Sequence, residues 1–370
     1  MQTMDATTLG LDVAAIDERL AAGLNLPAHC YLDQHVFDFE MQAIFDRSWQ
    51  YFAPRERLTE PGTVRTGQVG RVPIIVARGQ DGELRGFVNV CRHRGFTLVD
   101  EDKQCSRIQC AYHTWTYALD GALVRTPRTD GIGEDPATLG LLPVSVEEWG
   151  QGVYVNPDPE ALPMAQFHGR LNDMQAMTGL DLDPGNWSWV GRYSHDQDAN
   201  WKLWYDNGTE CYHCPTVHRT SFGSAYDVTS PDSYKQWFWD SMYSGTFDPT
   251  SGGKADVQGS GYRSVQLFPG NQYVQQDGFT VLGRAIPNGP ASTTFVVDYY
   301  AEEGTSDDDV EEWTKLWNQT YDEDARIVEE VQRNLASGRV TEMRYIPKLE
   351  DASRFMHGLV WDAYRAALGV

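Results

Sequence analysis

The sequence contains no uninterrupted run of about 18 apolar residues, which is the length that a membrane-spanning helix requires. Its first ten residues, Met1 to Gly10, lack both the basic segment and the apolar segment of a secretory signal. Internal repeats and long low-complexity linkers are also missing. We therefore expect neither a transmembrane helix nor a secretory leader, and the expected location is the cytoplasm.

Positive charge is scarce. Lysine and arginine number 30 against 53 aspartates and glutamates, so the formal net charge is −23. Nucleic acids and anionic membranes would repel such a chain, and neither is expected as a partner. The simplest interpretation of the charge is solubility, and the charge does not identify a substrate.

Cysteine is too sparse for a disulfide scaffold, with six residues in a chain of 370. In a large cytosolic protein, closely spaced cysteines and histidines point first to metal. The chain is too long for one hydrophobic core, and a typical domain size of about 100–200 residues predicts two domains. The composition, 41% hydrophobic and 22% charged, is that of an ordinary globular enzyme.

The hydrophobic pattern changes along the chain. Residues 12–49 are predicted to be mostly helical, and a small all-β domain is predicted from about residue 47 to about residue 150. Its strands are expected at 72–76, 86–90, 107–110 and 115–119. Further strands are expected at 272–274, 280–286 and 293–300, and helices at 201–213, 308–336 and 351–368. Residues 221–265 stay unassigned.

Two mixed cysteine–histidine pairs form the strongest signal. One residue separates Cys91 from His93, and sixteen residues later Cys110 is followed by His113 at a spacing of three. Such pairs can hold a [2Fe–2S] cluster, with both thiolates on one iron and both imidazoles on the other. A structural zinc site is the alternative, but zinc fingers usually group like residues together. If these four residues were only buried core residues, the occurrence of two closely spaced cysteine–histidine pairs would have no explanation.

A second histidine cluster follows about ninety residues later. His213 and His218 lie just after Glu210. Two histidines and a carboxylate on one face of a metal form the facial triad of non-haem Fe(II) oxygenases, which leaves positions open for O₂. On a straight helix, positions five apart diverge by about 140°, so the helix must break between the two histidines, and Pro215 supplies a reason.

A CxxC motif, Cys211 and Cys214, surrounds the first of these histidines. A redox pair or a zinc site built on it would ignore the flanking histidines. Both cysteines are therefore interpreted as packing residues, as are the lone residues Cys30 and Cys105.

The third ligand of a facial triad must come from elsewhere, and Asp322, Glu323 and Asp324 are candidates. The helix predicted there has an inward apolar stripe that consists of Ile327, Val328, Val331 and Leu335. Asp324 lies on that stripe, whereas Asp322 lies about 200° away on the solvent side. A buried carboxylate is costly unless it is paired or bound to metal, so Asp324 is preferred. An ordinary acid at a helix start is the alternative.

Both motifs resemble those of one family. Residues 91–95 (Cys-Arg-His-Arg-Gly) and 110–117 (Cys-Ala-Tyr-His-Thr-Trp-Thr-Tyr) resemble the Rieske motif of ring-hydroxylating oxygenase α-subunits. That family usually has proline where Ala111 stands and glycine where Thr114 stands. Residues 201–218 resemble the family's iron motif, and the similarity extends from about residue 30 to about residue 368.

The resemblance implies an α+β fold, in which an all-β Rieske [2Fe–2S] domain is inserted in a catalytic domain with a helix-grip-like antiparallel sheet. Residues 1–46 would form the N-terminal helical part of the catalytic domain. Residues 47–155 would form the Rieske domain, and residues 156–370 would form the catalytic domain that holds a mononuclear non-haem Fe(II).

The resemblance also implies the ligands of both cofactors. The cluster ligands would be Cys91, His93, Cys110 and His113, and the ligands of the mononuclear iron would be His213, His218 and Asp324. Asn207 and Glu210 are the candidate catalytic residues. Glu210 stands at the position of a bridging carboxylate, more often aspartate, and would link His113 of one subunit to His213 of the next in a homotrimer.

The implied function is the oxygenase component of a multicomponent enzyme, for O₂-dependent mono- or dihydroxylation of a small organic molecule. A ferredoxin or a flavin reductase that uses NADH or NADPH would supply the electrons, and a β-subunit could accompany the chain.

An aromatic substrate is expected, because a set of aromatic residues could line a pocket for a planar ring: Tyr234, Trp237, Phe238, Trp239 and Tyr243. Alternatively these rings could hold a quaternary ammonium or methylated amine for oxidative demethylation, or could belong to the core. A rival from another class is a Rieske electron carrier, which would have no use for the second metal site.

Overall fold

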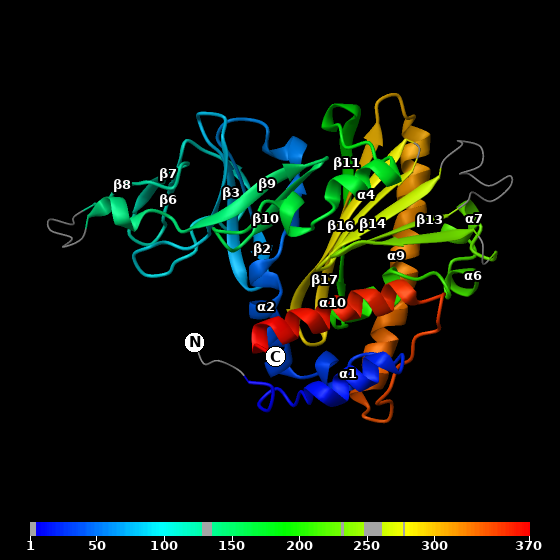
Figure 1. Ribbon diagram of the computed structural model, residues 1–370. Helices are drawn as coiled ribbons and strands as arrows, with labels where there is room; N and C mark the ends of the chain where they lie inside the picture. Colours follow the sequence, from blue (N-terminus) through cyan, green and yellow to red (C-terminus); the bar gives the residue numbers. More distant parts are fainter. Residues whose placement is uncertain (1–4, 128–134, 231–232, 248–260, 277) are drawn as a thin grey trace. The chain divides into compact units, whose positions relative to one another are not determined.

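The computed structural model describes residues 5–127, 135–230, 233–247, 261–276 and 278–370 (Figure 1). The chain forms two compact units. One unit contains the described residues up to Ile44, Ala165–Asp181 and Gly185–Val370, and the other contains Phe45–Met164 and Leu182–Pro184. The second unit is therefore an insertion in the first, and it extends a little beyond the 47–155 expected from the sequence. No helix in the described part of the chain has the length and apolar character needed to cross a membrane.

The inserted unit is built from two antiparallel sheets. The larger sheet has the strand order β1-β10-β9-β4-β3-β2-β5, and the smaller has the order β6-β7-β8. The strands are β1 (Gln50–Pro54), β2 (Thr63–Val69), β3 (Val72–Arg78), β4 (Leu84–Val88), β5 (Lys103–Gln104), β6 (Arg107–Gln109), β7 (Thr116–Ala118), β8 (Leu123–Arg125), β9 (Pro143–Trp149) and β10 (Gly152–Asn156). The four strands expected here are confirmed to within two residues as β3, β4, β6 and β7.

Strand β3 supports the first metal motif, because it is buried on both faces. Ile74 and Val76 belong to one hydrophobic cluster, whereas Ile75 and Ala77 belong to another. Successive side chains of a strand point to opposite faces, so a continuous apolar run is what a strand between two cores requires. The cluster that contains Ile75 also contains both motif cysteines, which ties the metal-binding loops to the sheet.

The other unit contains one seven-stranded antiparallel sheet of order β11-β17-β16-β15-β14-β13-β12. Its strands are β11 (Trp187–Gln197), β12 (Tyr234–Phe238), β13 (Met242–Phe247), β14 (Tyr262–Leu267), β15 (Asn271–Gln276), β16 (Phe279–Gly289) and β17 (Ser292–Glu302). The three strands expected from the sequence are confirmed as β15, β16 and β17. The unassigned stretch supplies β12, β13 and the start of β14, and residues 248–260 of that stretch lie outside the described residues.

Helices surround this sheet, and their bounds are α1 (Val13–Ala21), α2 (Gln34–Ala43), α3 (Met164–Phe167), α4 (Leu171–Thr178), α5 (Trp201–Gly208), α6 (Cys214–Val217), α7 (Phe222–Ala225), α9 (Asp307–Ala336) and α10 (Asp351–Leu368). The two C-terminal helices expected from the sequence are confirmed as α9 and α10. Ser306 caps α9 by accepting a hydrogen bond from the backbone N–H of Asp309.

The long helix α9 lies along the yellow strands of the sheet (Figure 1). It contacts them through aromatic residues spaced four apart: Trp313, Trp317 and Tyr321. Trp313 stacks on Phe279 with ring centroids 6.5 Å apart, and Tyr321 meets Phe295 edge-on at 5.1 Å. Residues four apart share one face of a helix, so the same face of the next turn of α9 also points toward the interior of this unit.

A buried ion pair connects three helices of this unit. Lys202 Nζ of α5 lies 2.5 Å from Glu40 Oε1 of α2, and both side chains are completely buried. Glu40 also accepts hydrogen bonds from Trp201 Nε1, at 2.8 Å, and from the hydroxyl of Tyr364 in α10. Buried charges are tolerated only when paired and hydrogen-bonded, so these contacts determine how α2, α5 and α10 pack.

Lys202→Met should destabilise the protein by about 3–5 kcal/mol, because it leaves the Glu40 carboxylate buried without its cation. Chemical denaturation monitored by tryptophan fluorescence measures the change. The double variant Lys202→Met/Glu40→Leu removes both charges and should recover most of the loss. Lys315→Met, at an exposed position of α9, is the control for loss of a lysine. Equal stability of the Lys202 and Lys315 variants would contradict this prediction.

Candidate metal centres and their surroundings

Two loops of the inserted unit present the cysteine–histidine pairs in the same way. The backbone N–H groups of Cys91 and Cys110 each donate, at 2.8 Å, to the carbonyl five residues later. Gly95 and Thr114, each four residues after a cysteine, adopt left-handed φ values of 73° and 58° and donate back to the cysteine carbonyl at 3.0 Å. Each cysteine is therefore held at the base of a closed turn.

Thr114 departs from the glycine that the related motif usually has. A β-branched residue in the left-handed region costs roughly 1–2 kcal/mol relative to glycine. Despite this cost, Thr114 keeps the same turn as Gly95, so the substitution does not alter the loop geometry.

The structure brings the four residues of the first motif together, with sulfur inside and imidazole outside. Cys91 and Cys110 are each 2% exposed, and burial raises the pKa of the Cys110 thiol. His93 and His113 are exposed, with ring centroids 4.6 Å apart. The Tyr117 hydroxyl lies 3.4 Å from Cys91 Sγ. This arrangement fits a [2Fe–2S] cluster with a buried thiolate-bound iron and an outer imidazole-bound iron.

The second motif lies where α5 ends. The expectation of one helix over 201–213 is wrong at its C-terminal end, because α5 stops at Gly208. Pro215 does not cause this break. It occupies the first turn of α6, where a missing N–H is tolerated. His213 and His218 then lie at the two ends of the short helix α6, which allows both rings to face one point.

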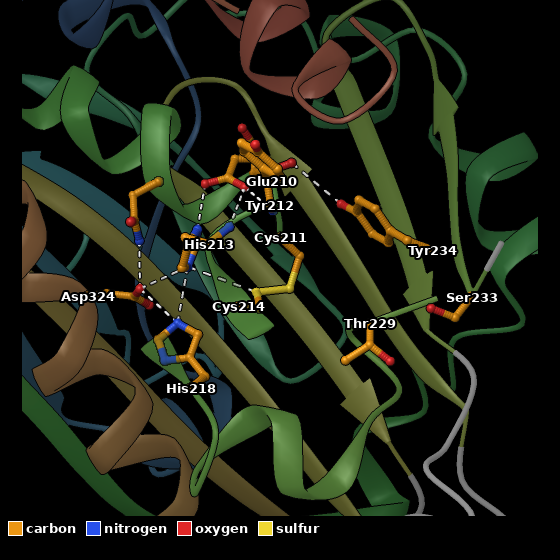
Figure 2. The surroundings of a disulfide bond; sticks show 12 residues. Glu210, Cys211, Tyr212, His213, Cys214, His218, Thr229, Ser233, Tyr234 and Asp324 are labelled. Atoms are coloured by element: carbon orange, nitrogen blue, oxygen red, sulfur yellow. Dashed lines mark hydrogen bonds and ion pairs between the residues drawn. A yellow bond between two sulfur atoms is a disulfide. The ribbon is translucent and has the colours of Figure 1, made fainter. Parts of the chain in front are cut away.

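Three potential ligand atoms converge at that point (Figure 2). His213 Nε2 lies 3.1 Å from His218 Nε2 and 3.4 Å from Asp324 Oδ1, and His218 Nε2 lies 3.0 Å from Asp324 Oδ1. Neighbouring ligands bound to one ion at about 2.1 Å are about 3 Å apart, so a single transition-metal ion fits among them. Asp324 is 7% exposed, whereas Asp322 is exposed, as the helical phase predicted.

A carboxylate holds the outer nitrogen of each histidine. His213 Nδ1 donates to Glu210 Oε1 at 2.5 Å, and His218 Nδ1 donates to Glu323 Oε2 at 2.8 Å. Ser221 Oγ also donates to Glu323, at 2.6 Å. Glu323 was one of three candidates for the third ligand, and the structure instead places it where it orients His218. Such contacts fix the ring so that Nε2 faces the metal position.

The electrostatics favour a divalent cation at the centre. Burial lowers the pKa of His213, but hydrogen bonds with Asp324 and Glu210 outweigh burial and raise this pKa to about 10. Burial raises the pKa of Asp324, but its hydrogen bonds with His213 and His218 outweigh that effect and lower it. Asn207 Nδ2 donates to Asp324 Oδ1 at 2.7 Å and fixes that carboxylate. Metal binding would replace the imidazole protons, so it should weaken as pH falls.

The interpretation of Cys211 and Cys214 as unpaired packing residues is wrong, because a disulfide joins them (Figure 2). The chain has left the helix at Gly208, and their Cα atoms lie 4.9 Å apart, within reach of a disulfide. Cys214 Sγ lies 3.9 Å from His213 Nε2. Because Cys214 Sγ is bonded to Cys211 in the disulfide, Asp324 is the better candidate for the third ligand beside His213 and His218.

A cavity adjoins the converging atoms, and eight of the nineteen residues that line it are phenylalanine, tryptophan or tyrosine. The aromatic residues are Trp204, Phe222, Tyr234, Tyr243, Phe247, Tyr262, Trp317 and Tyr321. No lysine or arginine is among the described residues that line it.

The sequence analysis identified only part of this wall. Tyr234 and Tyr243 line the cavity, but the expectation is wrong for Trp237, Phe238 and Trp239. Phe238, for example, lies at the end of β12 and packs on Phe355 of α10, 5.2 Å away. Three of the remaining aromatic residues, Phe222, Phe247 and Tyr262, come from the stretch that the sequence left unassigned. The other three, Trp204, Trp317 and Tyr321, lie on predicted helices, but nothing in the sequence marked them as facing a cavity.

Comparison with known proteins accounts for most of the chain. Residues 48–142 match the Rieske [2Fe-2S] domain, and residues 184–366 match the ring hydroxylating alpha subunit (catalytic domain). These matches confirm the α+β fold, both cofactors and the oxygenase class. They also exclude the simple electron carrier, which would lack the catalytic domain.

The chain is similar along most of its length to oxygenases of quaternary ammonium compounds. It is 31% identical to the carnitine monooxygenase oxygenase subunit of Acinetobacter pittii, over 84% of this chain and 85% of that protein. It is 28% identical to the glycine betaine monooxygenase oxygenase subunit of Chromohalobacter salexigens, over 88% and 86%. Aromatic compound catabolism, which the sequence analysis favoured, finds no support among these relatives.

Solved structures agree with this result. A quaternary ammonium Rieske monooxygenase in complex with an inhibitor superposes with a TM-score of 0.83 at 25% identity, over 94% of this chain and 98% of that one. Naphthalene 1,2-dioxygenase from Rhodococcus superposes with a TM-score of 0.79 at 21% identity, over 96% and 98%. At that identity the second structure shares the fold alone.

Asp324→Ala should lose the mononuclear iron and keep the visible absorption of the cluster, because it removes one ligand of the second site only. Iron and acid-labile sulfide analysis after iron-replete expression measures this. Asp322→Ala is the matched control on the same helix and should retain all the iron. If the Asp322 variant loses iron and the Asp324 variant does not, the assignment of the third ligand is wrong.

Proposed function

This chain belongs to the Rieske non-haem iron oxygenases, as an α-type catalytic subunit, and on that premise we propose that it oxidatively demethylates a quaternary ammonium compound. In such a reaction, O₂, two electrons and two protons convert one N-methyl group into formaldehyde. The other products are the tertiary amine, water and one proton. The observation that carries the proposal is the aromatic, anion-bearing cavity beside the second metal centre.

The cavity suits a methylated cation. Tyr234 stacks on Phe247 at 4.3 Å, and Tyr262 stacks on Trp317 at 6.2 Å. The face of an aromatic ring attracts a cation by about 0.5–2 kcal/mol, and a quaternary nitrogen needs no hydrogen-bond partner. Glu210 and Asp324, which also line the cavity, contribute carboxylate groups. An uncharged aromatic ring would gain nothing from these carboxylates.

We also propose which residues bind the cluster and the mononuclear iron. The cluster ligands are Cys91, His93, Cys110 and His113, and the mononuclear iron ligands are His213, His218 and Asp324. Iron bound at the second site would supply O₂ activation, and a [2Fe–2S] cluster bound at the first would supply electron transfer. The protein contributes orientation: Asn207 holds Asp324 at 2.7 Å, and Glu210 holds His213 at 2.5 Å.

We further propose that the enzyme works as a homotrimer, in which Glu210 connects the partner subunit's His113 to His213. Rieske oxygenases obtain electrons from a reductase or ferredoxin, and an exposed imidazole is a natural exit for them. His113 is exposed and contacts the ring of Tyr112, which in turn packs on Phe96, and these two rings are 53% and 45% exposed. Glu210 already accepts from His213, and a carboxylate has acceptor capacity for a second imidazole.

The purified enzyme, supplied with a reductase and NADH, should oxidise at least one of carnitine, glycine betaine and choline and release formaldehyde. Benzoate and naphthalene should give no product. Tyr262→Leu should raise the Michaelis constant for the quaternary ammonium substrate about tenfold, because it removes one cation–π contact. Tyr262→Phe keeps the ring and is the control. Ring hydroxylation of an aromatic compound without any demethylation would overturn the proposed substrate class.

Glu210→Gln should keep both metals but slow single-turnover oxidation of the reduced cluster, with substrate and O₂ present, by roughly 10–100-fold. Stopped-flow absorbance of the cluster measures this rate. Glu323→Gln is the matched control, because it also removes a carboxylate from a histidine Nδ1 but does not lie at the proposed bridge. A wild-type rate in Glu210→Gln would disprove the bridging role without affecting the family assignment.

A further inference from the structure

Three residues that line the cavity each carry a buried hydrogen-bonding group with no partner among the described residues. These groups are Nε1 of Trp204, Nε1 of Trp317 and the hydroxyl of Tyr243. The three residues are only 3%, 3% and 1% exposed. An indole N–H can only donate, so two of these groups can be satisfied by an acceptor alone. An unpaired buried donor destabilises the folded protein, so a native protein retains one for a reason.

The two indoles lie near the proposed iron ligands. Trp317 stacks on Tyr321 at 5.5 Å, and Trp204 packs against the same ring at 6.3 Å. Tyr321 precedes Asp324 by less than one helical turn. The Tyr321 hydroxyl itself donates to Gln272 Oε1 at 3.2 Å, so it is not one of the free donors.

On the sheet side, a glycine allows the free tyrosine hydroxyl to reach its position. Tyr243, Gly245 and Phe247 point to the same face of β13, and the first and third of these line the cavity. A Cβ atom at Gly245 would lie 2.6 Å from the Tyr243 hydroxyl and 2.8 Å from the Tyr234 hydroxyl. Any larger residue would displace these two groups. The Tyr234 hydroxyl donates to Thr209 O at 3.4 Å, which leaves Tyr243 as the free group.

We propose that Trp204, Trp317 and Tyr243 form a subsite that binds an oxygen acceptor of the substrate. The inference rests on the proposed function, because the stacked rings described above would hold the ammonium group of the same molecule. It restricts the substrate to quaternary ammonium compounds with a hydroxyl or carboxylate oxygen a few bonds from the nitrogen. The three donors are neutral, so they suit a hydroxyl oxygen, and hydrogen bonds from neutral donors can also hold a carboxylate.

The test compares choline with ethyltrimethylammonium, which has the same cation and lacks only the oxygen, and includes glycine betaine as the carboxylate case. The wild-type enzyme should favour at least one oxygen-bearing substrate by about tenfold or more in kcat/KM. Tyr243→Phe and Trp317→Phe keep an aromatic ring and remove one donor. Each variant should bring the ratio of kcat/KM for that substrate to kcat/KM for ethyltrimethylammonium closer to one.

Binding provides a second measurement that does not depend on turnover. The rise in melting temperature that choline or glycine betaine produces should shrink in both variants relative to the rise that ethyltrimethylammonium produces. Iron content and cluster absorption show whether each variant is folded. Because Tyr243→Phe removes a single oxygen atom, it keeps the test decisive if Trp317→Phe folds poorly.

The outcomes distinguish a failure of the proposed subsite from a failure of the proposed function. A larger loss with choline assigns the subsite to a hydroxyl, and a larger loss with glycine betaine assigns it to a carboxylate. If the wild-type enzyme oxidises the three compounds with equal kcat/KM and Tyr243→Phe changes no ratio, water satisfies these donors, and the subsite is wrong while the proposed function stands. If no quaternary ammonium compound binds or reacts, both are overturned.

Discussion

The catalytic unit depends on one constraint, the need to compensate a carboxylate buried inside protein. Asp324 is 7% exposed and accepts hydrogen bonds from the side chain of Asn207 and from the rings of His213 and His218. An isolated buried charge is strongly unfavourable, so these donors must surround it or a metal ion must bind it. Since Asp324 belongs to α9 and its partners belong to α5 and the segment around α6, this requirement determines how three parts of the chain meet.

The same electrostatic logic extends outward from the metal position. Glu210 and Glu323 each accept a hydrogen bond from the Nδ1 atom of one histidine, so both rings direct Nε2 toward the metal position. The cavity beside this position is lined by the carboxylates of Glu210 and Asp324 and by eight aromatic side chains. A metal dication at the metal position and an organic cation against the rings would both be stabilised there. Fold alone does not decide this, because naphthalene 1,2-dioxygenase shares the architecture.

Much of the protein could be predicted from local patterns. The paired spacings of Cys91, His93, Cys110 and His113 predict the cluster because the ligands lie on two short loops with identical turns. Helical periodicity distinguishes the buried Asp324 from the exposed Asp322, because the phase of one helix is a local property. Four strands of the inserted unit, β3, β4, β6 and β7, and the last two helices were located within a few residues for the same reason.

The tertiary structure decided what depends on contacts between distant segments. The orienting role of Glu323 arises only when α9 lies against His218, 105 residues earlier in the sequence. The disulfide between Cys211 and Cys214 was missed because a CxxC spacing by itself does not distinguish a bonded pair from two packing residues. The cavity wall draws on both sheet strands and helices, which strand pairing and burial bring together. The sequence by itself therefore determined which metals the protein can hold, and the packing of the chain decided what surrounds them.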